Sequence, residues 1–141
     1  MTQYKVDAGQ IKIIHTLLAR IGMANDKDYK MGLVQEYSNK RETSTKELMR
    51  EEAKALIEDL QGMVGWTAEE IQANQKRRKI FGIAHEMNWE LEDHKVDKVR
   101  VDAWCINYGF MHKPLAEYSN NELSKLVWQF LQVKKDYINA L

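Results

Sequence analysis

Apolar residues along this chain recur three and four positions apart, a spacing that places them on one face of an α-helix. Six stretches show the pattern, and glycines or polar turns separate them. Their apolar positions are Ile11, Ile14, Leu18 and Ile21; Tyr29, Leu33, Val34 and Tyr37; Met49, Ala53, Leu56, Ile57 and Leu60; Ile80, Ile83, Ala84 and Met87; Val96, Val99, Ala103 and Ile106; and Leu123, Leu126, Val127, Phe130 and Leu131. The pattern predicts an all-α fold of about six helices.

Three sequences of the form Ser/Thr-x-x-Glu, beginning at Ser44, Thr67 and Ser119, mark expected helix starts. In such a capping box the hydroxyl and the carboxylate each accept a hydrogen bond from a backbone N–H that the helix leaves unpaired. Asp26 or Asn25 is the expected cap of the second helix. We therefore expect helices to begin close to these positions.

The two halves of the chain carry similar landmarks in the same order. Lys12-Ile13 and Lys79-Ile80 each open a helix, and the boxes at Ser44 and Ser119 each open a later one. With this pairing the second half has about eight extra residues, expected in 90–95 or 109–118. One interpretation is two related three-helix units packed as one compact domain. The other interpretation is that the halves are not related, because capping boxes recur in unrelated helical proteins.

The domain organisation that we expect follows from these landmarks. It comprises an N-terminal extension (1–9), a first three-helix unit (10–62), a connecting polar and basic segment (63–79) and a second three-helix unit (80–141). A unit of about 65 residues is marginally stable by itself. We therefore expect the two units to pack together.

Composition excludes several classes of protein. Of the 141 residues 44% are hydrophobic and 30% charged, and 21 Lys and Arg balance 21 Asp and Glu. No apolar run approaches the ~20 residues that span a bilayer, and the polar start Met1–Asp7 lacks the apolar run of a secretory signal. The single cysteine, Cys105, has no partner for an internal disulfide. We expect a cytoplasmic protein that makes no membrane contact.

The chain shows none of the usual signatures of an active site. His15, His85, His94 and His112 lack the spacing of a zinc site. Cys105 lies among apolar neighbours, where cysteines are normally inert, and no nucleophile elbow or phosphate-binding glycine loop occurs. We expect no catalytic residue, no metal and no cofactor, and hence a protein that is not an enzyme.

One dense basic run stands out from the neutral background. The run is Lys76, Arg77, Arg78 and Lys79, and Lys95 and Lys98 would extend it if two helices are neighbours. Clustered cations of this kind contact nucleic-acid phosphates and release counterions. A charged run is also typical of a solvated helix face. A more specific DNA hypothesis is a helix-turn-helix motif over 10–37. Acidic residues in its second helix disfavour this hypothesis, because the helix that reads DNA is usually less acidic.

Aromatic residues suggest a different kind of contact. Trp104 and Trp128 flank apolar helix positions, so we expect them in the core. Trp66 and Trp89 lie at helix boundaries, and with Tyr118 they are the expected exposed anchors for a protein partner. Trp66 has an alternative role as a hydrophobic staple against its own helix.

Several short sequences together resemble one phage family. They are Gln10-Ile11-Lys12-Ile13-Ile14-His15, Arg20-Ile21-Gly22-Met23, Ser44-Thr45-Lys46-Glu47-Leu48, Val101-Asp102-Ala103-Trp104 and Leu123-Ser124-Lys125-Leu126-Val127. From about residue 10 to 135 the chain resembles the GemA regulatory-protein family of Mu-like bacteriophages and prophages. The resemblance implies an early phage protein that affects host gene expression or DNA metabolism, without established catalytic or binding residues. The chain differs from that family in its neutral charge and in having no proline in 62–79.

Two hypotheses from different functional classes follow. The first is a non-enzymatic phage or prophage regulatory protein that contacts DNA through its basic residues. The second is a protein–protein adaptor that binds a host replication or DNA-topology protein without nucleic-acid contact. A continuous basic face would favour the first hypothesis, and a contiguous exposed apolar patch would favour the second.

Overall fold

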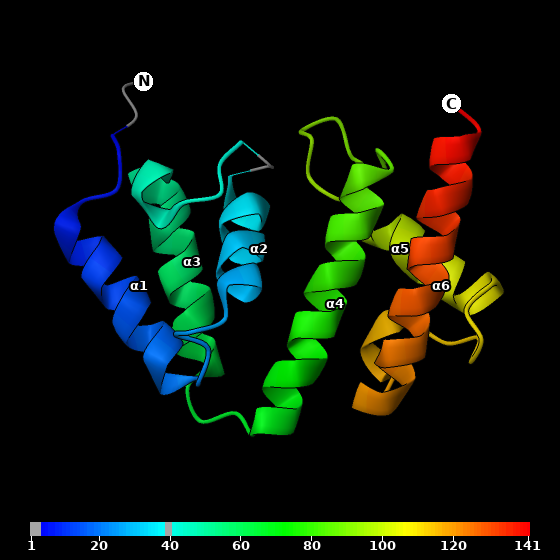
Figure 1. Cartoon of the computed structure of the whole chain (residues 1–141), viewed down its shortest axis with the longest axis horizontal. Helices are drawn as coiled ribbons and strands as arrows, with labels where there is room; N and C mark the ends of the chain where they lie inside the picture. The colour runs from blue at the N-terminus through cyan, green and yellow to red at the C-terminus, as the bar shows by residue number, and fades with distance from the viewer. Residues whose placement is uncertain (1–3, 39–40) are drawn as a thin grey trace. The chain divides into compact units, whose positions relative to one another are not determined.

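In the computed structural model, which describes residues 4–38 and 41–141, the chain forms six α-helices and two short 3₁₀ helices (Figure 1). In chain order these are α1 (Ala8–Arg20), α2 (Lys27–Tyr37), η1 (Thr45–Glu47), α3 (Arg50–Met63), α4 (Ala68–Glu86), α5 (Lys98–Asn107), η2 (Leu115–Glu117) and α6 (Asn120–Asn139). Across the described residues the extended pairings are two isolated bridges, Lys5 with Met49 and Glu90 with Val96. The predicted all-α fold of about six helices is confirmed.

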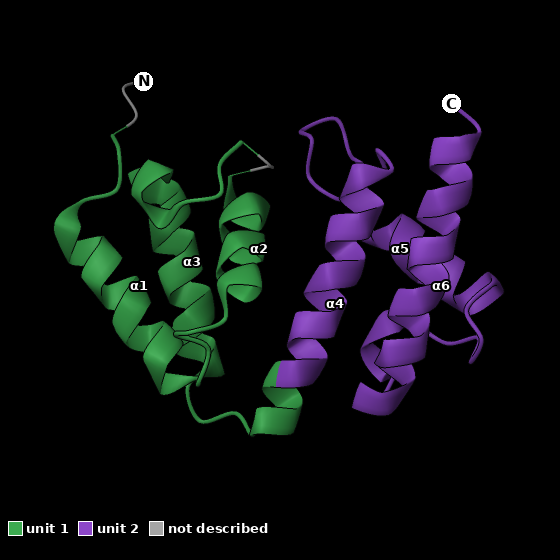
Figure 2. Ribbon diagram, viewed as in Figure 1, with its two compact units in different colours: residues 1–71 green, residues 72–141 purple. Residues whose placement is uncertain are grey.

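The chain divides into two compact units, Met1–Ile71 and Gln72–Leu141, which we call unit 1 and unit 2 (Figure 2). The division falls inside α4, so the segment expected to connect the units, 63–79, is helical from Ala68 onward. Residues 1–3 of the expected N-terminal extension lie outside the described residues. The described part of that extension belongs to unit 1, where Val6 N–H donates to Leu48 O (2.8 Å) and Asp7 caps α1.

Each unit buries its own hydrophobic core, built from one face of each of its three α-helices. In unit 1 the buried helical residues are Ile14, Leu17 and Leu18 of α1, Tyr29, Leu33 and Val34 of α2, Ala53, Leu56, Leu60 and Met63 of α3, and Ile71 from the first turn of α4. In unit 2 they are Ala73, Ile80, Ile83 and Ala84 of α4, Val101 and Cys105 of α5, and Leu123, Leu126, Val127 and Phe130 of α6. Complete burial of a large apolar side chain contributes about 1.5–3 kcal/mol, so these faces hold each unit together.

Predicted caps begin three of the helices. Glu70 N–H donates to Thr67 Oγ1 (3.1 Å), and Ser119 N–H donates to Glu122 Oε1 (2.8 Å), as two capping boxes require. Asp26 begins α2 by accepting a hydrogen bond from a backbone N–H three residues later (2.9 Å). These local signals were sufficient to place the starts of α2, α4 and α6.

The prediction that Ser44 begins the third α-helix is wrong. Ser44 accepts a long hydrogen bond from a backbone N–H two residues later (3.4 Å) and begins the short η1. The helix α3 follows Met49, whose N–H donates to the Glu52 carboxylate (2.8 Å). Glu47, the expected partner of Ser44, pairs instead with Lys5 (2.9 Å), a contact between distant parts of the sequence.

The two units repeat the same order of elements, two α-helices, a 3₁₀ helix and a third α-helix. Buried positions of α1 recur 66 residues later around α4, in the pairs Ile14 and Ile80, Leu17 and Ile83, Leu18 and Ala84, and Ile21 and Met87. Both helices are followed by a residue in the left-handed conformation, Gly22 (φ 78°) and Asn88 (φ 61°). In both, the next N–H donates to the carbonyl five positions earlier (2.8 Å and 3.0 Å).

The third α-helices, α3 and α6, repeat at a separation of 70 residues. Met49 and Ser119 precede them, and each donates its backbone N–H across 2.8 Å to a carboxylate three positions later, Glu52 or Glu122. Buried positions also coincide, in the pairs Ala53 and Leu123, Leu56 and Leu126, and Leu60 and Phe130. The expected pairing of Ser44 with Ser119 is therefore wrong.

An insertion of five residues in unit 2 explains the change of register. Three positions separate Met23 from Asp26, the cap of α2, whereas eight separate Trp89 from Asp97, the cap of α5. The insertion lies in one of the two expected segments, 90–95. The offset between the third helices (70 residues) exceeds that between the first helices (66 residues) by four residues, rather than by about eight. Because the units share this register, exposed positions of one unit have counterparts in the other.

Candidate functional site

The first two residues of the basic run make hydrogen bonds within unit 2. Lys76 Nζ donates to the main-chain and side-chain oxygens of Asn120 (3.1 Å and 2.7 Å), at the start of α6. Arg77 Nη2 donates to the carbonyl oxygen of Tyr118 (3.1 Å), and its Nε is buried. Lys76 and Arg77 are half-buried. Their charges therefore attach α4 to the start of α6 rather than pointing outward to a phosphate.

The other four predicted phosphate contacts differ in exposure. Arg78 is half-buried and donates from Nε to Asn74 Oδ1 (2.8 Å). Lys79, Lys95 and Lys98 are exposed. Half of the six predicted residues are thus open to solvent, and these three remain candidates for contact with a polyanion.

Two cations at the start of α5 lie over aromatic rings of unit 2. Lys98 Nζ is 5.1 Å from the centroid of the Phe81 ring, and the guanidinium carbon of Arg100 is 4.5 Å from the centroid of the Trp89 ring. Cation–π attraction favours these positions. Both cationic residues remain exposed, so they add to the positive charge available at the surface.

Two of the three expected aromatic anchors are buried, which corrects the prediction for them. Trp66 is 39% exposed, as expected, but Trp89 and Tyr118 are only 8% and 1% exposed. The Trp89 ring packs edge-on against Phe130 (6.0 Å between centroids), and the Tyr118 hydroxyl donates to the carbonyl oxygen of Cys105 (3.3 Å). Contacts with residues far away in the sequence bury both rings, so neither can anchor a partner.

Trp128, which the sequence placed in the core, is exposed. Its side chain is 59% exposed, and on the same helix Leu131 is 38% and Ile138 51% exposed. With the exposed Lys135 these residues follow one another along α6 in steps of three, four and three, so all four lie on one side of the helix. We call Trp128, Leu131, Lys135 and Ile138 the α6 outer face.

Unit 1 provides an internal reference for this face. The positions in α3 that lie 70 residues before Trp128 and Leu131 are Glu58 and Gln61, and both are exposed. Unit 1, which repeats the order of elements and the buried positions of unit 2, therefore folds with polar side chains at these positions. We conclude that the fold does not require the apolar side chains of Trp128 and Leu131.

The side of α5 that the sequence placed in the core is also exposed. Val99 is 80% exposed, and Ala103 and Ile106 are exposed as well, whereas Val101 and Cys105 form the buried side. The helix carries apolar residues at helical spacing on two sides, and only one of them faces the core. The exposed side of α5 contains no aromatic residue, which distinguishes it from the α6 outer face.

Two kinds of reactive group considered in the sequence, the single cysteine and possible metal ligands, can be located in the described residues. Burial, with a smaller effect from the charge of Asp102, raises the pKa of Cys105 to about 12. Because the thiolate is the nucleophilic form, this thiol is unreactive at neutral pH. Within residues 4–38 and 41–141, no group of three His, Cys, Asp or Glu side chains is placed to hold a metal ion.

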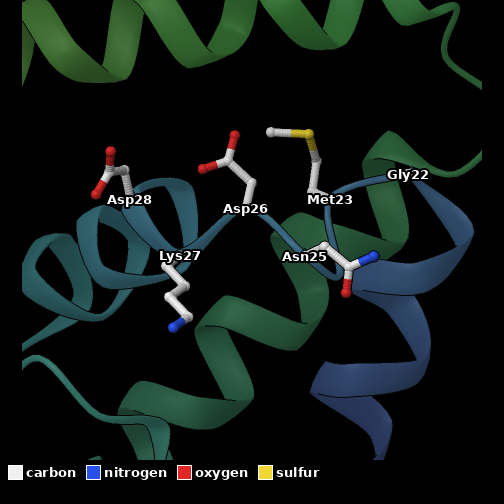
Figure 3. A pocket seen from close by; sticks show the side chains of 6 residues that line it. All are labelled: Gly22, Met23, Asn25, Asp26, Lys27 and Asp28. Carbon is white, nitrogen blue, oxygen red and sulfur yellow. The ribbon is translucent and has the colours of Figure 1, made fainter.

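An open, shallow depression lies at the turn between α1 and α2, lined by Gly22, Met23 and residues 25–28 (Figure 3). The side chains of Asp26, Asp28 and Met23 project to the same side of this turn (Figure 3). Asp26 is the cap of α2, and carboxylates are favoured in the first turn of a helix by its dipole. The start of the helix therefore accounts for both acids without a ligand.

This chain matches no protein-family model, no curated protein and no solved structure in comparisons with known proteins. Within the described part of the chain, no helix is both long enough and apolar enough to cross a membrane.

Proposed function

We propose that this chain is a non-enzymatic adaptor that binds a protein partner through the α6 outer face. The observation that carries the proposal is the exposure of Trp128, Leu131 and Ile138 on one side of α6, where unit 1 has polar residues at two of the counterpart positions. Exposed apolar patches of this kind often mark interaction sites. Tryptophan is enriched among the residues that contribute most to protein–protein binding.

The expected biological setting comes from the resemblance to the GemA family. In that setting the chain is a phage or prophage regulatory protein in the bacterial cytoplasm, and its partner is a host replication or DNA-topology protein. The neutral net charge of the chain supports a protein partner, because a neutral protein has no overall attraction for a polyanion.

Capture of partners from a bacterial lysate tests the proposal. The bait is either the wild-type chain or the double variant Trp128→Glu/Leu131→Gln, which copies the polar residues of unit 1. A matched control, Ile13→Lys, removes an exposed apolar residue of unit 1 and copies its counterpart Lys79. We expect the wild-type chain and Ile13→Lys to capture the same proteins. The double variant should fail to capture them. Retention of the same proteins by all three baits would contradict the proposal.

DNA contact is a second candidate function, supported by the exposure of Lys79, Lys95 and Lys98. It is tested by fluorescence anisotropy with short duplex and single-stranded DNA at low and moderate salt. Each phosphate contact contributes about one unit to the dependence of log K on log salt, so Lys79→Glu/Lys98→Glu should weaken binding and reduce that slope by about two. An absence of binding at low salt would exclude this candidate.

A further inference from the structure

The α6 outer face has the residue spacing of a coiled-coil seam. Steps of three, four and three lead from Trp128 through Leu131 and Lys135 to Ile138, which is the spacing of the a and d positions of a heptad repeat. The face extends over about 15 Å of helix at ~1.5 Å per residue. Another α-helix is the element that packs its side chains between residues spaced in this way.

Lys135 places a positive charge within this apolar seam. It is exposed and forms no ion pair within the described part of the chain, whereas the adjacent Lys134 pairs with Glu86. Covering an unpaired ammonium group with apolar side chains is unfavourable because the group loses its hydration. A carboxylate on the partner, opposite Lys135, compensates for this loss.

A second copy of the same helix does not supply that carboxylate. In a parallel, in-register pair of α6 helices Lys135 faces Lys135, and in an antiparallel pair it faces Leu131. The α6 outer face itself contains no acidic residue. A lysine at one core position of a seam therefore disfavours self-association and selects a different helix.

We infer that the partner binds the α6 outer face with an amphipathic helix whose apolar seam carries a carboxylate opposite Lys135. This inference rests on the proposed function and adds the chemistry of the partner. Three observations carry it: the heptad spacing, the uncompensated charge of Lys135, and the polar residues that unit 1 has at the counterparts of Trp128 and Leu131.

Two synthetic helical peptides test the inference. Each has three heptads with Leu at the a and d positions, except that one central core position is Glu in the first peptide and Lys in the second. Binding to the full chain is measured by the anisotropy of the labelled peptide. We expect the Glu peptide to bind about tenfold or more tightly than the Lys peptide, and Lys135→Glu to reverse the preference. The control Lys54→Glu makes the same charge change at an exposed position of α3 in unit 1 and should leave the preference unchanged.

Equal affinity for the two peptides, no binding of either, or an unchanged preference in Lys135→Glu would overturn the inference. Dimerisation of the chain in analytical ultracentrifugation that Trp128→Glu abolishes would also overturn it, because a second copy would then occupy the face. If the peptides fail while lysate capture still depends on Trp128 and Leu131, the proposed function stands and only the helical partner is rejected. If both experiments fail, the proposed function is rejected as well.

Discussion

The hydroxyl of Tyr118 donates a hydrogen bond to the carbonyl oxygen of Cys105 across 3.3 Å, and both residues are buried in unit 2. Gly109 lies against the same two groups. A Cβ at this position would overlap the Tyr118 hydroxyl oxygen and the Cys105 carbonyl oxygen. The contact between η2 and α5 therefore requires a residue without a side chain at position 109.

Gly109→Ala should lower the free energy of unfolding by about 1–3 kcal/mol, because the added methyl group forces the Tyr118 ring or the backbone of α5 to move. Urea unfolding followed by tryptophan fluorescence measures the change. Gly62→Ala is the matched control, since a Cβ at Gly62 meets nothing within 4 Å. It should stabilise the chain by up to about 1 kcal/mol. Equal effects of the two substitutions would contradict the packing described here.

Glu52 and Glu122, at equivalent positions of α3 and α6, link stability to pH. Burial is the largest influence on Glu52 and raises its pKa, but hydrogen bonds from Arg41 and a backbone N–H outweigh it, so that the pKa is lowered. A hydrogen bond from Lys113, followed by one from a backbone N–H, lowers the pKa of Glu122. A carboxyl with a lowered folded-state pKa stabilises the fold above its unfolded-state pKa. That contribution is lost as the pH falls through the folded-state value.

The free energy of unfolding should therefore decrease as the pH falls below about 5. In the double variant Glu52→Gln/Glu122→Gln this decrease should be smaller, because two of the linked carboxyls are absent. Glu51→Gln, an exposed neighbour in the first turn of α3, is the control and should keep the wild-type dependence. Urea unfolding at pH 7 and at pH 3 gives the comparison. The same acid-induced loss in the double variant and in wild type would exclude these two residues as its source.

Opposite sides of α6 should respond differently to substitution. Trp128→Glu/Leu131→Gln should change the free energy of unfolding by no more than about 0.5 kcal/mol per site, because both side chains are exposed and unit 1 has polar residues at these positions. Phe130→Ala, on the buried side, should cost about 3–5 kcal/mol. Thermal and urea unfolding measure both effects. A double variant as unstable as Phe130→Ala would show that the outer face supports the fold.

Local signals in the sequence were enough to predict much of the fold. Helical spacing identified the six α-helices, and caps such as Asp26, Thr67 and Ser119 placed three of their starts. A cap acts through hydrogen bonds to residues two or three positions away, so nearby sequence contains the information. The repeated order of elements was also visible, although its register depended on buried positions that only the structure identifies.

The candidate site was harder to predict because its exposure depends on contacts between distant residues. In α5 and α6 apolar residues occur at helical spacing on two sides, and the sequence does not show which side meets the core. The spacing in the sequence therefore predicts a buried Trp128, which is exposed, and an exposed Trp89, which the contact with Phe130 buries. The charge of Lys76 was evident, but its partner Asn120 lies 44 residues away.

Site-specific photocrosslinking in bacterial cells tests most directly whether the α6 outer face, and not its counterpart in unit 1, contacts a protein partner. One variant carries a photoreactive phenylalanine analogue in place of Trp128, and the other carries it in place of Glu58, the equivalent exposed position of α3. We expect a crosslinked adduct with a partner protein from position 128 and none from position 58. Adducts of equal yield from both positions, or none from position 128, would contradict the assignment of the α6 outer face as the docking surface.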